Sequence, residues 1–199
     1  MRGLLVAVLL AGGVAAADDA GWQRVAERDG VVVESRATSK PSVYELRATA
    51  RSSLPPAAIM GVLWKHEEFP QFVPYLKRLD VLRDEGDVRL LYEQFHVPVL
   101  KDRDATVRVT RAFSPATGVY EMTSIATSDD GPPPRDDYVR IRESRGQWRL
   151  VPADGGGTAV TYTIRADVGG LAPAWIVRIA QRDVATRFVL AVLDRAQHQ

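Results

Sequence analysis

Most of this chain consists of short runs in which apolar and polar residues alternate, and Gly, Asp and Pro turns separate the runs. Alternation with a period of two predicts β-strands that bury one face. Because no helical pattern lies between most of the runs, we expect an antiparallel meander and not a series of parallel βαβ units. The predicted strands are residues 22–27, 31–36, 43–50, 88–111, 118–126, 138–143, 147–151 and 159–166.

Helical patterns interrupt and end these strands. Ser53 is predicted as a helix cap, and Pro55 and Pro56 fit the first turn of the helix. A second short helical stretch should follow, with apolar residues at Phe69, Phe72, Val73, Leu76 and Leu79. One long helix is predicted over residues 173–195, with an apolar stripe of Val177, Ala180, Val184, Phe188 and Ala191. The sheet should bury its apolar face against this last helix, which gives an α+β fold with core or pocket between the two layers.

The N-terminus has the pattern of a secretory signal peptide. Arg2 gives a cationic start, an apolar run follows, and Ala15-Ala16-Ala17 is an A-x-A cleavage site. The apolar run is shorter than the ~20 residues of a transmembrane span, so we favour cleavage after Ala17 over a membrane anchor. We therefore expect a signal peptide over residues 1–17, a domain over residues 22–196, and export to the periplasm or the medium.

Charge and composition exclude several function classes. The 26 Lys and Arg residues balance 25 Asp and Glu residues, so the chain lacks the basic surface that binds nucleic acid. Without cysteine it can form no disulfide, thiol nucleophile or cysteine zinc site. His66, His96 and His198 do not have the spacing of a metal motif, and no G-x-S-x-G motif occurs. We expect a monomer that uses no metal and no cofactor.

Three segments carry a family resemblance. Residues 54–64 and 69–75 form a pair of short helical segments, residues 91–104 end in Arg103-Asp104, and residues 162–175 contain Asp167, Gly169-Gly170 and Pro173. Together they resemble the START (steroidogenic acute regulatory protein-related lipid transfer) branch of the helix-grip superfamily, which includes Bet v 1 and polyketide cyclases. The resemblance implies a curved antiparallel sheet wrapped around a long C-terminal helix, with two short helices between early strands. It also implies one bound lipid or sterol-like molecule, no catalytic step and transient contact with a membrane.

Glu93 is the most informative polar residue. It shares an apolar strand face with Leu91 and Phe95, where an unpaired charge would cost several kcal/mol. Arg111 is a candidate partner, and the alternatives are that Glu93 meets water at a strand end or forms a structural pair. Some sterol-binding relatives have an acid at this position and an Arg six residues after Arg103, where this chain has Val109. The resemblance therefore favours a lipid-like cargo over a sterol.

Further site residues are predicted from the inward-facing parity of each strand and from the last helix. The predicted ligand-binding residues are Glu93, Phe95, Val107, Val109, Arg111, Tyr120, Met122, Trp148, Tyr162, Ile176, Ile179 and Ala180. The residues predicted to hold the entrance loop and the lid are Arg103, Asp104, Gly169, Gly170 and Trp175, with the glycine pair as hinge. For each of the apolar residues, ordinary core packing is the alternative.

Three functions compete. The first is a carrier or sensor that binds a lipid or another hydrophobic molecule without catalysis. The second is a polyketide cyclase or dehydratase that uses the same cavity, with Glu93 and Tyr162 as its candidate acid-base groups. Export and the lack of a histidine predicted to face inward disfavour this enzyme. The third is an envelope interaction protein whose interior is filled by side chains.

Overall fold

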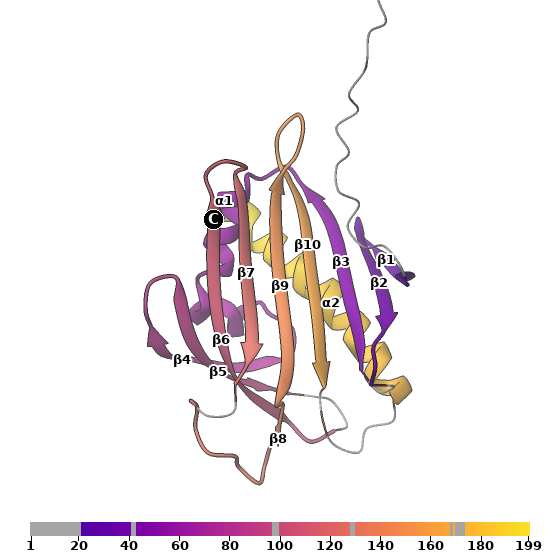
Figure 1. Cartoon of the computed structure of the whole chain (residues 1–199), viewed down its shortest axis with the longest axis vertical. Coiled ribbons are helices and arrows are strands. Elements are labelled where there is room, and N and C mark those ends of the chain that lie inside the picture. Colours follow the sequence, from indigo (N-terminus) through magenta and orange to yellow (C-terminus); the bar gives the residue numbers. More distant parts are fainter. Residues whose placement is uncertain (1–20, 41–42, 97–99, 128–129, 168, 170–173) are drawn as a thin grey trace, which may run out of the picture.

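The structure, a computed structural model, describes residues 21–40, 43–96, 100–127, 130–167, 169 and 174–199, with side chains from residue 182 onward in the last segment. One face of a large sheet is crossed by a long C-terminal helix (Figure 1). The elements in chain order are β1 (Gln23–Arg28), β2 (Val31–Ala37), β3 (Tyr44–Ser52), α1 (Pro56–Leu63), the 3₁₀-helix η1 (His66–Gln71), β4 (Leu76–Asp84), β5 (Val88–Phe95), β6 (Arg103–Ser114), β7 (Val119–Ala126), β8 (Val139–Arg140), β9 (Glu143–Pro152), β10 (Thr158–Asp167) and α2 (Ala174–Gln197).

The sheet is antiparallel along its whole path. Its order is β1-β2-β3-β10-β9-β7-β6-β5-β4, and only the short β8 pairs in parallel, with β6. The first hairpin turns at Asp29 and Gly30, which both have positive φ, at 49° and 77°. Two positive φ angles are the signature of a type I′ turn, and Asp-Gly is a preferred sequence for it. The predicted meander and its α+β helix-grip architecture are confirmed.

The segment after β3 differs in part from the prediction. Helix α1 begins at Pro56 with no side-chain cap, and the Ser52 hydroxyl, not that of Ser53, accepts a hydrogen bond from the Leu54 N–H at 3.2 Å. The prediction of Ser53 as cap is therefore wrong, whereas the proline in the first turn is confirmed. Of the predicted strand over 138–143, only Val139–Arg140 is a separate strand, and Glu143 begins β9.

Leu76 and Leu79 belong to strand β4 and not to a helix. Their spacing of three residues resembles the spacing on one face of a helix. In the strand, both side chains are nevertheless buried on the same face. The pairing of β4 with β5 shifts between Leu76 and Arg78, which is a β-bulge that adds one residue to the strand. The bulge brings positions three apart onto the same face of the sheet, so the pattern was assigned to the wrong element.

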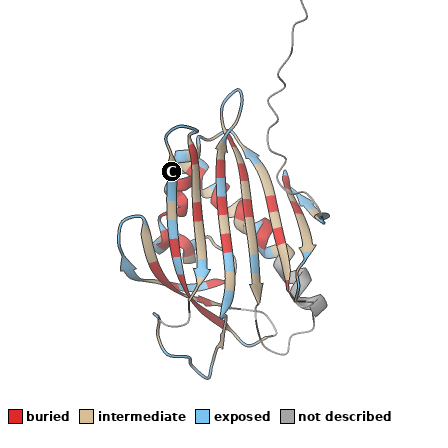
Figure 2. Ribbon diagram, in the orientation of Figure 1, coloured by how far each residue is buried: buried red, intermediate tan, exposed pale blue. Residues whose placement is uncertain are grey.

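Helix α2 closes the core over the inner face of the sheet. Its most deeply buried side chains are Ala185, Val189 and Val192, whereas Val184 is 37% exposed. The predicted stripe is thus one residue out of step with the buried face in this part of the helix, although Phe188 packs on the core as predicted. Val177 and Ala180 lie outside the described side chains. Buried positions recur along the central strands and beneath α2 (Figure 2).

Candidate ligand-binding cavity

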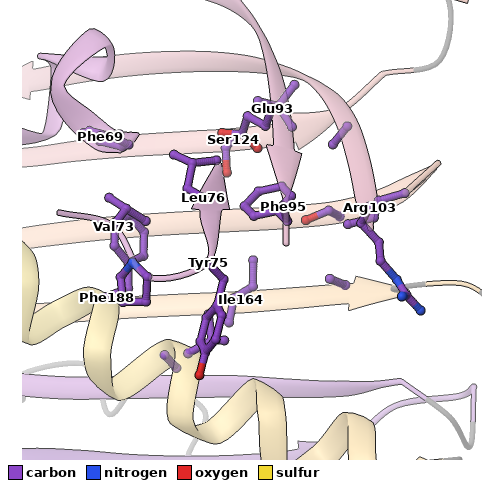
Figure 3. Close-up of a pocket in the computed structure, with 18 of the residues that line it drawn as sticks. Phe69, Val73, Tyr75, Leu76, Glu93, Phe95, Arg103, Ser124, Ile164 and Phe188 are labelled. Atoms are coloured by element: carbon purple, nitrogen blue, oxygen red, sulfur yellow. The ribbon is translucent and has the colours of Figure 1, made fainter. Parts of the chain in front are cut away.

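A cavity of about 420 Å³ lies between the sheet and α2. Its walls come from the inner faces of β3, β5, β6, β7, β9 and β10, from η1 and the loop after it, and from α2. Figure 3 shows Glu93, Phe95 and Ile164 on the sheet and Val73, Tyr75 and Phe188 on the other side of the pocket. The volume lies in the range of small-molecule sites. The third candidate function, a protein whose interior is filled, does not fit this cavity.

Small side chains explain why the interior is hollow here. Ala105, Ser124 and Ser144 line the cavity at positions where larger residues would fill it. Gly146, buried on the same face of β9, packs closely against Ser124, because a Cβ there would lie 2.6 Å from the Ser124 hydroxyl oxygen. Beside this hollow, aromatic rings pack closely. Phe188 meets the rings of Trp148, Tyr162 and Phe69 at centroid distances of 5.2, 5.3 and 6.0 Å.

Most of the predicted ligand-binding residues with described side chains line this cavity. The strand residues that do so are Glu93, Phe95, Val107, Val109, Met122, Trp148 and Tyr162. Their role in binding remains a prediction. Trp175, Ile176, Ile179 and Ala180 lie in α2 but outside the described side chains, and Gly170 is also outside the described residues.

Glu93 brings a carboxyl group into this apolar space. Within the described part of the chain its carboxyl has no hydrogen-bond or ion-pair partner. Burial without compensation raises the pKa of Glu93 from 4.5 to about 7. The hydroxyl of Tyr162 likewise has no partner, and its pKa is raised first by burial and then by the negative charge of Glu93. The two groups are therefore within electrostatic reach of each other across the cavity.

Arg111 is not the partner of Glu93. Its Nε donates to Asp87 Oδ1 at 2.8 Å, and its guanidinium lies 4.3 Å from the centre of the Trp64 ring. These contacts hold Arg111 at the far end of β6, and it does not line the cavity. The prediction failed because strand parity gives the face of a residue but not its distance along the strand.

Tyr120 also lies outside the cavity wall. It occupies the inner face of β7 with Met122, but its ring packs on Phe113, with centroids 4.4 Å apart. Val119 and Tyr120 begin β7, whereas Met122 and Ser124 reach the hollow region. Core packing, the alternative reading of this residue, describes Tyr120 better.

Arg103 and Asp104 are neighbours in β6, and their side chains point to opposite faces of the sheet. Arg103 lines the cavity and donates to the backbone carbonyl of Lys101 and, at 3.3 Å, to that of Gly169. Gly169 has a φ of 61°, a conformation that suits glycine. Arg103 thus ties the strand to the junction before α2, at the site where the hinge was predicted.

Asp104 lies in a polar network on the outer face. It accepts two hydrogen bonds from Arg140, at 2.9 and 2.8 Å, and one from the Tyr92 hydroxyl at 2.8 Å. Burial alone would raise the pKa of Asp104, but these bonds outweigh it and the pKa is lowered. Residues 130–142, which we call the strap, join this network through Arg140, and β8 within the strap pairs with β6 in the sheet. Arg140 and Tyr92 were not predicted to take part.

Several residues of the cavity wall were missed by sequence reasoning. His66 is 1% exposed and lines the cavity, so the expectation that no histidine faces inward was wrong. Its position in a helical row with Ile59, Val62 and Leu63 was the available signal. Burial and the nearby Arg89 lower the pKa of His66 to about 3, so the ring is neutral. Ser124 and Ser144 follow the same two-residue alternation as Met122 and Trp148.

The cavity combines a mainly apolar wall with a few polar and titratable side chains. The described residues contain no group of three or more His, Cys, Asp or Glu side chains that could hold a metal ion. No helix among the described residues is long and apolar enough to cross a membrane. The lining offers a large apolar surface, the carboxyl group of Glu93, the guanidinium of Arg103, two imidazole rings and a few hydroxyls to a guest molecule.

Comparison with known proteins agrees with this arrangement. An uncharacterized protein of Pseudomonas aeruginosa is 24% identical over 184 residues, which cover 88% of this chain and 89% of that protein. The crystal structure of a STAR-related lipid transfer protein from Xanthomonas axonopodis superposes with a TM-score of 0.81 at 24% identity, covering 89% of this chain and 99% of that one.

The fold is shared with proteins of more than one activity. The Zhui aromatase/cyclase from a Streptomyces species has a TM-score of 0.58 at 15% identity, over 78% of this chain and 94% of that one. A family model described as polyketide cyclase / dehydrase and lipid transport matches residues 52–193. With a START-type helix-grip fold and a match over most of its length, this chain belongs to the polyketide cyclase / dehydrase and lipid transport family.

Proposed function

We propose that this protein is a non-catalytic carrier or sensor that binds a lipid or another hydrophobic small molecule between its sheet and α2. The observation that carries the proposal is the mainly apolar cavity of about 420 Å³, whose lining includes both small residues and aromatic rings. An apolar cavity of this size offers its lining fewer protein packing partners than a filled core, and a bound ligand would supply them. The family and its lipid transfer relative support the same function.

Filling the cavity tests this proposal. Ser144→Leu places an apolar side chain in the hollow, and Arg145→Leu places the same side chain on the exposed outer face, one residue along β9. Binding of the uncharged apolar dye N-phenyl-naphthylamine is followed by its fluorescence. We expect the native chain and Arg145→Leu to bind the dye equally and Ser144→Leu to bind it more weakly. Equal binding by all three chains would show that the dye does not occupy the cavity.

The natural cargo is then sought by mass spectrometry. The protein is purified from its own host under native conditions, and the ligand is identified after extraction with solvent. Ser144→Leu, purified in parallel, should carry less ligand. Recovery of the native chain without any bound lipid, together with no dye binding, would overturn the carrier proposal.

The enzyme alternative rests on one observation. Glu93 has its pKa raised to about 7, where a carboxyl group can both give and take a proton at neutral pH. Such a group could serve cyclisation or dehydration of a polyketide. The protein is incubated with a minimal polyketide synthase that makes a linear polyketide. The products are compared with those formed when Glu93→Gln replaces the native chain. The carrier proposal predicts identical products, whereas a new product that disappears in Glu93→Gln would identify an enzyme.

We also propose that the protein acts outside the cytoplasm. The support is the signal-peptide pattern of residues 1–17 with its cleavage site after Ala17. Cell fractionation and sequencing of the N-terminus of the isolated protein test this directly. A protein that retains residues 1–17 and stays in the cytoplasm would contradict it.

A further inference from the structure

We propose that His66 donates a hydrogen bond to the bound ligand. The cavity therefore takes apolar molecules that carry an uncharged acceptor atom, such as a carbonyl oxygen, at the end that lies deepest. The inference rests on the proposed binding function and names the class of ligand. His66 lines the cavity, and its buried Nε2 has no hydrogen-bond partner within the described chain. Because buried polar atoms require such partners, an acceptor on the ligand would complete the site.

The other ring nitrogen of His66 shows where the ring carries its proton. Nη1 of Arg89 lies 3.3 Å from Nδ1 of His66. A guanidinium has no acceptor atom, so Arg89 is the donor in this contact and Nδ1 is the acceptor. A neutral imidazole that accepts at Nδ1 carries its proton on Nε2. The unpartnered atom is therefore an N–H donor, and only an acceptor can pair with it.

Arg89 also sets the direction of this donor. Nη2 of Arg89 lies 2.7 Å from Oδ2 of Asp84, whose side chain is 46% exposed, so Arg89 stands between His66 and the surface. The Nε2–H bond leaves the imidazole ring on the side away from Nδ1, and therefore away from Arg89. It points to the interior, where Phe69, with its ring centre 5.1 Å from that of His66, also lines the cavity.

His66 lies at the inner end of the cavity. Its partner Arg89 begins the inward-facing row of β5, and Phe95 ends this row. The two positions are three inward steps apart, which is roughly 20 Å along a strand. The Phe95 end is the open one, because the side chain of the next residue, His96, is 63% exposed and lines the cavity. The end of the ligand that reaches His66 is therefore the end that enters first.

The surroundings of His66 favour an uncharged acceptor. Val109, opposite Arg89, and Leu91, the next inward residue of β5, are apolar and line the cavity. Arg89 is already paired with Asp84, on the other side of the His66 ring. A carboxylate at this end would be buried without a counter-ion, which costs far more than burial of a carbonyl or ether oxygen.

The ring of His66 is neutral throughout the pH range in which binding is measured. Burial and then Arg89 lower its pKa to about 3, with Asp84 acting in the opposite direction and Arg111 in the same direction as Arg89. The donor at Nε2 is therefore the same at about pH 5 and about pH 8. The pKa of Glu93 is raised to about 7, so the pH separates a contact with His66 from a contact with Glu93.

A matched pair of ligands tests the proposal. Methyl undecyl ketone is compared with its methylidene analogue, in which a carbon replaces the carbonyl oxygen and the shape is kept. Each competes with N-phenyl-naphthylamine for the native chain, for His66→Phe and for the control His198→Phe, a histidine whose side chain is 70% exposed. We expect the ratio of ketone to analogue affinity to be about three- to tenfold higher in the native chain and the control than in His66→Phe. This difference should be equal at about pH 5 and about pH 8.

A second measurement uses the native chain and remains decisive if His66→Phe does not fold. Proton–nitrogen correlation spectra of the histidine side chains report the tautomer, with signals assigned by elimination in His96→Phe and His198→Phe. We expect the Nε2–H tautomer of His66 in the free chain and a downfield shift of this proton with the ketone but not with the analogue.

The outcomes distinguish the inference from the function on which it rests. An Nδ1–H tautomer, an Nε2 proton that responds equally to both ligands, or the same affinity ratio in the native chain and His66→Phe would overturn the inference and leave hydrophobic binding intact. A difference that disappears as the pH rises through 7 would assign the acceptor to Glu93 and overturn it as well. Failure of the dye itself to bind the native chain would instead overturn the proposed function, and the inference with it.

Discussion

The carboxyl group of Glu93 gives folding stability an unusual pH dependence. Its pKa is raised from 4.5 to about 7 in the folded protein. Between these values the unfolded chain has lost the proton and the folded chain keeps it, so the contribution of Glu93 to stability is greatest below pH 4.5 and falls as the pH rises towards 7. The loss is at most about 3 kcal/mol, since each pKa unit corresponds to 1.36 kcal/mol and the cavity admits some water.

Glu93→Gln should remove this loss. We expect the variant to exceed the native chain in free energy of unfolding by up to about 3 kcal/mol at about pH 8, and by much less at about pH 5. Urea unfolding at the two pH values measures the difference. Glu85→Gln, on an exposed residue, is the control and should show no such change. A gain that is the same at both pH values would mean that improved packing, and not removal of a buried charge, is responsible.

Gly61 is a residue whose replacement should stabilise the protein. It lies inside α1, and a Cβ added there would meet nothing within 4 Å. Alanine in an exposed helix interior is more stable than glycine by about 0.5–1 kcal/mol. We therefore expect Gly61→Ala to raise the thermal midpoint by about 1–4 °C. Gly30→Ala, the same change at a φ of 77°, is the control and should lower the midpoint.

At the scale of elements, the strap depends on a buried ion pair. The side chains of Arg140 and Asp104 are 6% and 1% exposed, and Nη2 lies 2.8 Å from Oδ2. Arg140 also donates to the carbonyl of Pro132 at 3.1 Å, so it joins β6 to the strap. Removal of one partner leaves a charge buried without compensation, which costs more than the pair contributes.

Asp104→Asn should therefore cost about 3–5 kcal/mol of folding stability. Chemical denaturation measures the loss, and hydrogen exchange should show faster exchange in the strap. Asp130→Asn breaks the exposed pair with Arg108 and is the control, with a much smaller expected effect. If adding Arg140→Met to Asp104→Asn recovers none of the loss, the uncompensated charge is not its cause.

The elements also show where a pattern of residues is ambiguous. Strand alternation located most of the sheet, because period two has no competing interpretation over runs of this length. The error at Leu76 and Leu79 came from a β-bulge, which changes the spacing of buried residues without a distinctive residue to mark it. The strap was missed for another reason. Its contacts with β5 and β6 join residues distant in sequence, such as Gln94 and Tyr138, whose side chains meet at 3.1 Å.

At the scale of the whole molecule, the sequence predicted the layers but not the hollow between them. Inward parity placed Glu93, Trp148 and Tyr162 in the cavity wall correctly, yet it also predicted Arg111 and Tyr120 there, and both lie outside the wall. A cavity depends on where small residues from distant strands meet. Ser124 and Gly146 are opposite one another only because β7 pairs with β9. The register between two strands is set when the sheet folds. The alternation of residues within one strand does not predict which residues of the neighbouring strand lie opposite them.

The cavity should make the stability of the whole fold depend on its contents. A ligand that binds the folded chain alone stabilises it by about 2.7 kcal/mol at a free concentration of one hundred times Kd, which corresponds to roughly 5–10 °C in thermal midpoint for a chain of this size. Thermal unfolding with and without N-phenyl-naphthylamine measures the shift. In Ser144→Leu the added side chain takes up part of the cavity, so the shift should be smaller than in Arg145→Leu. A shift of equal size in both variants would place the stabilising site on the surface, because only one of the two substitutions changes the cavity.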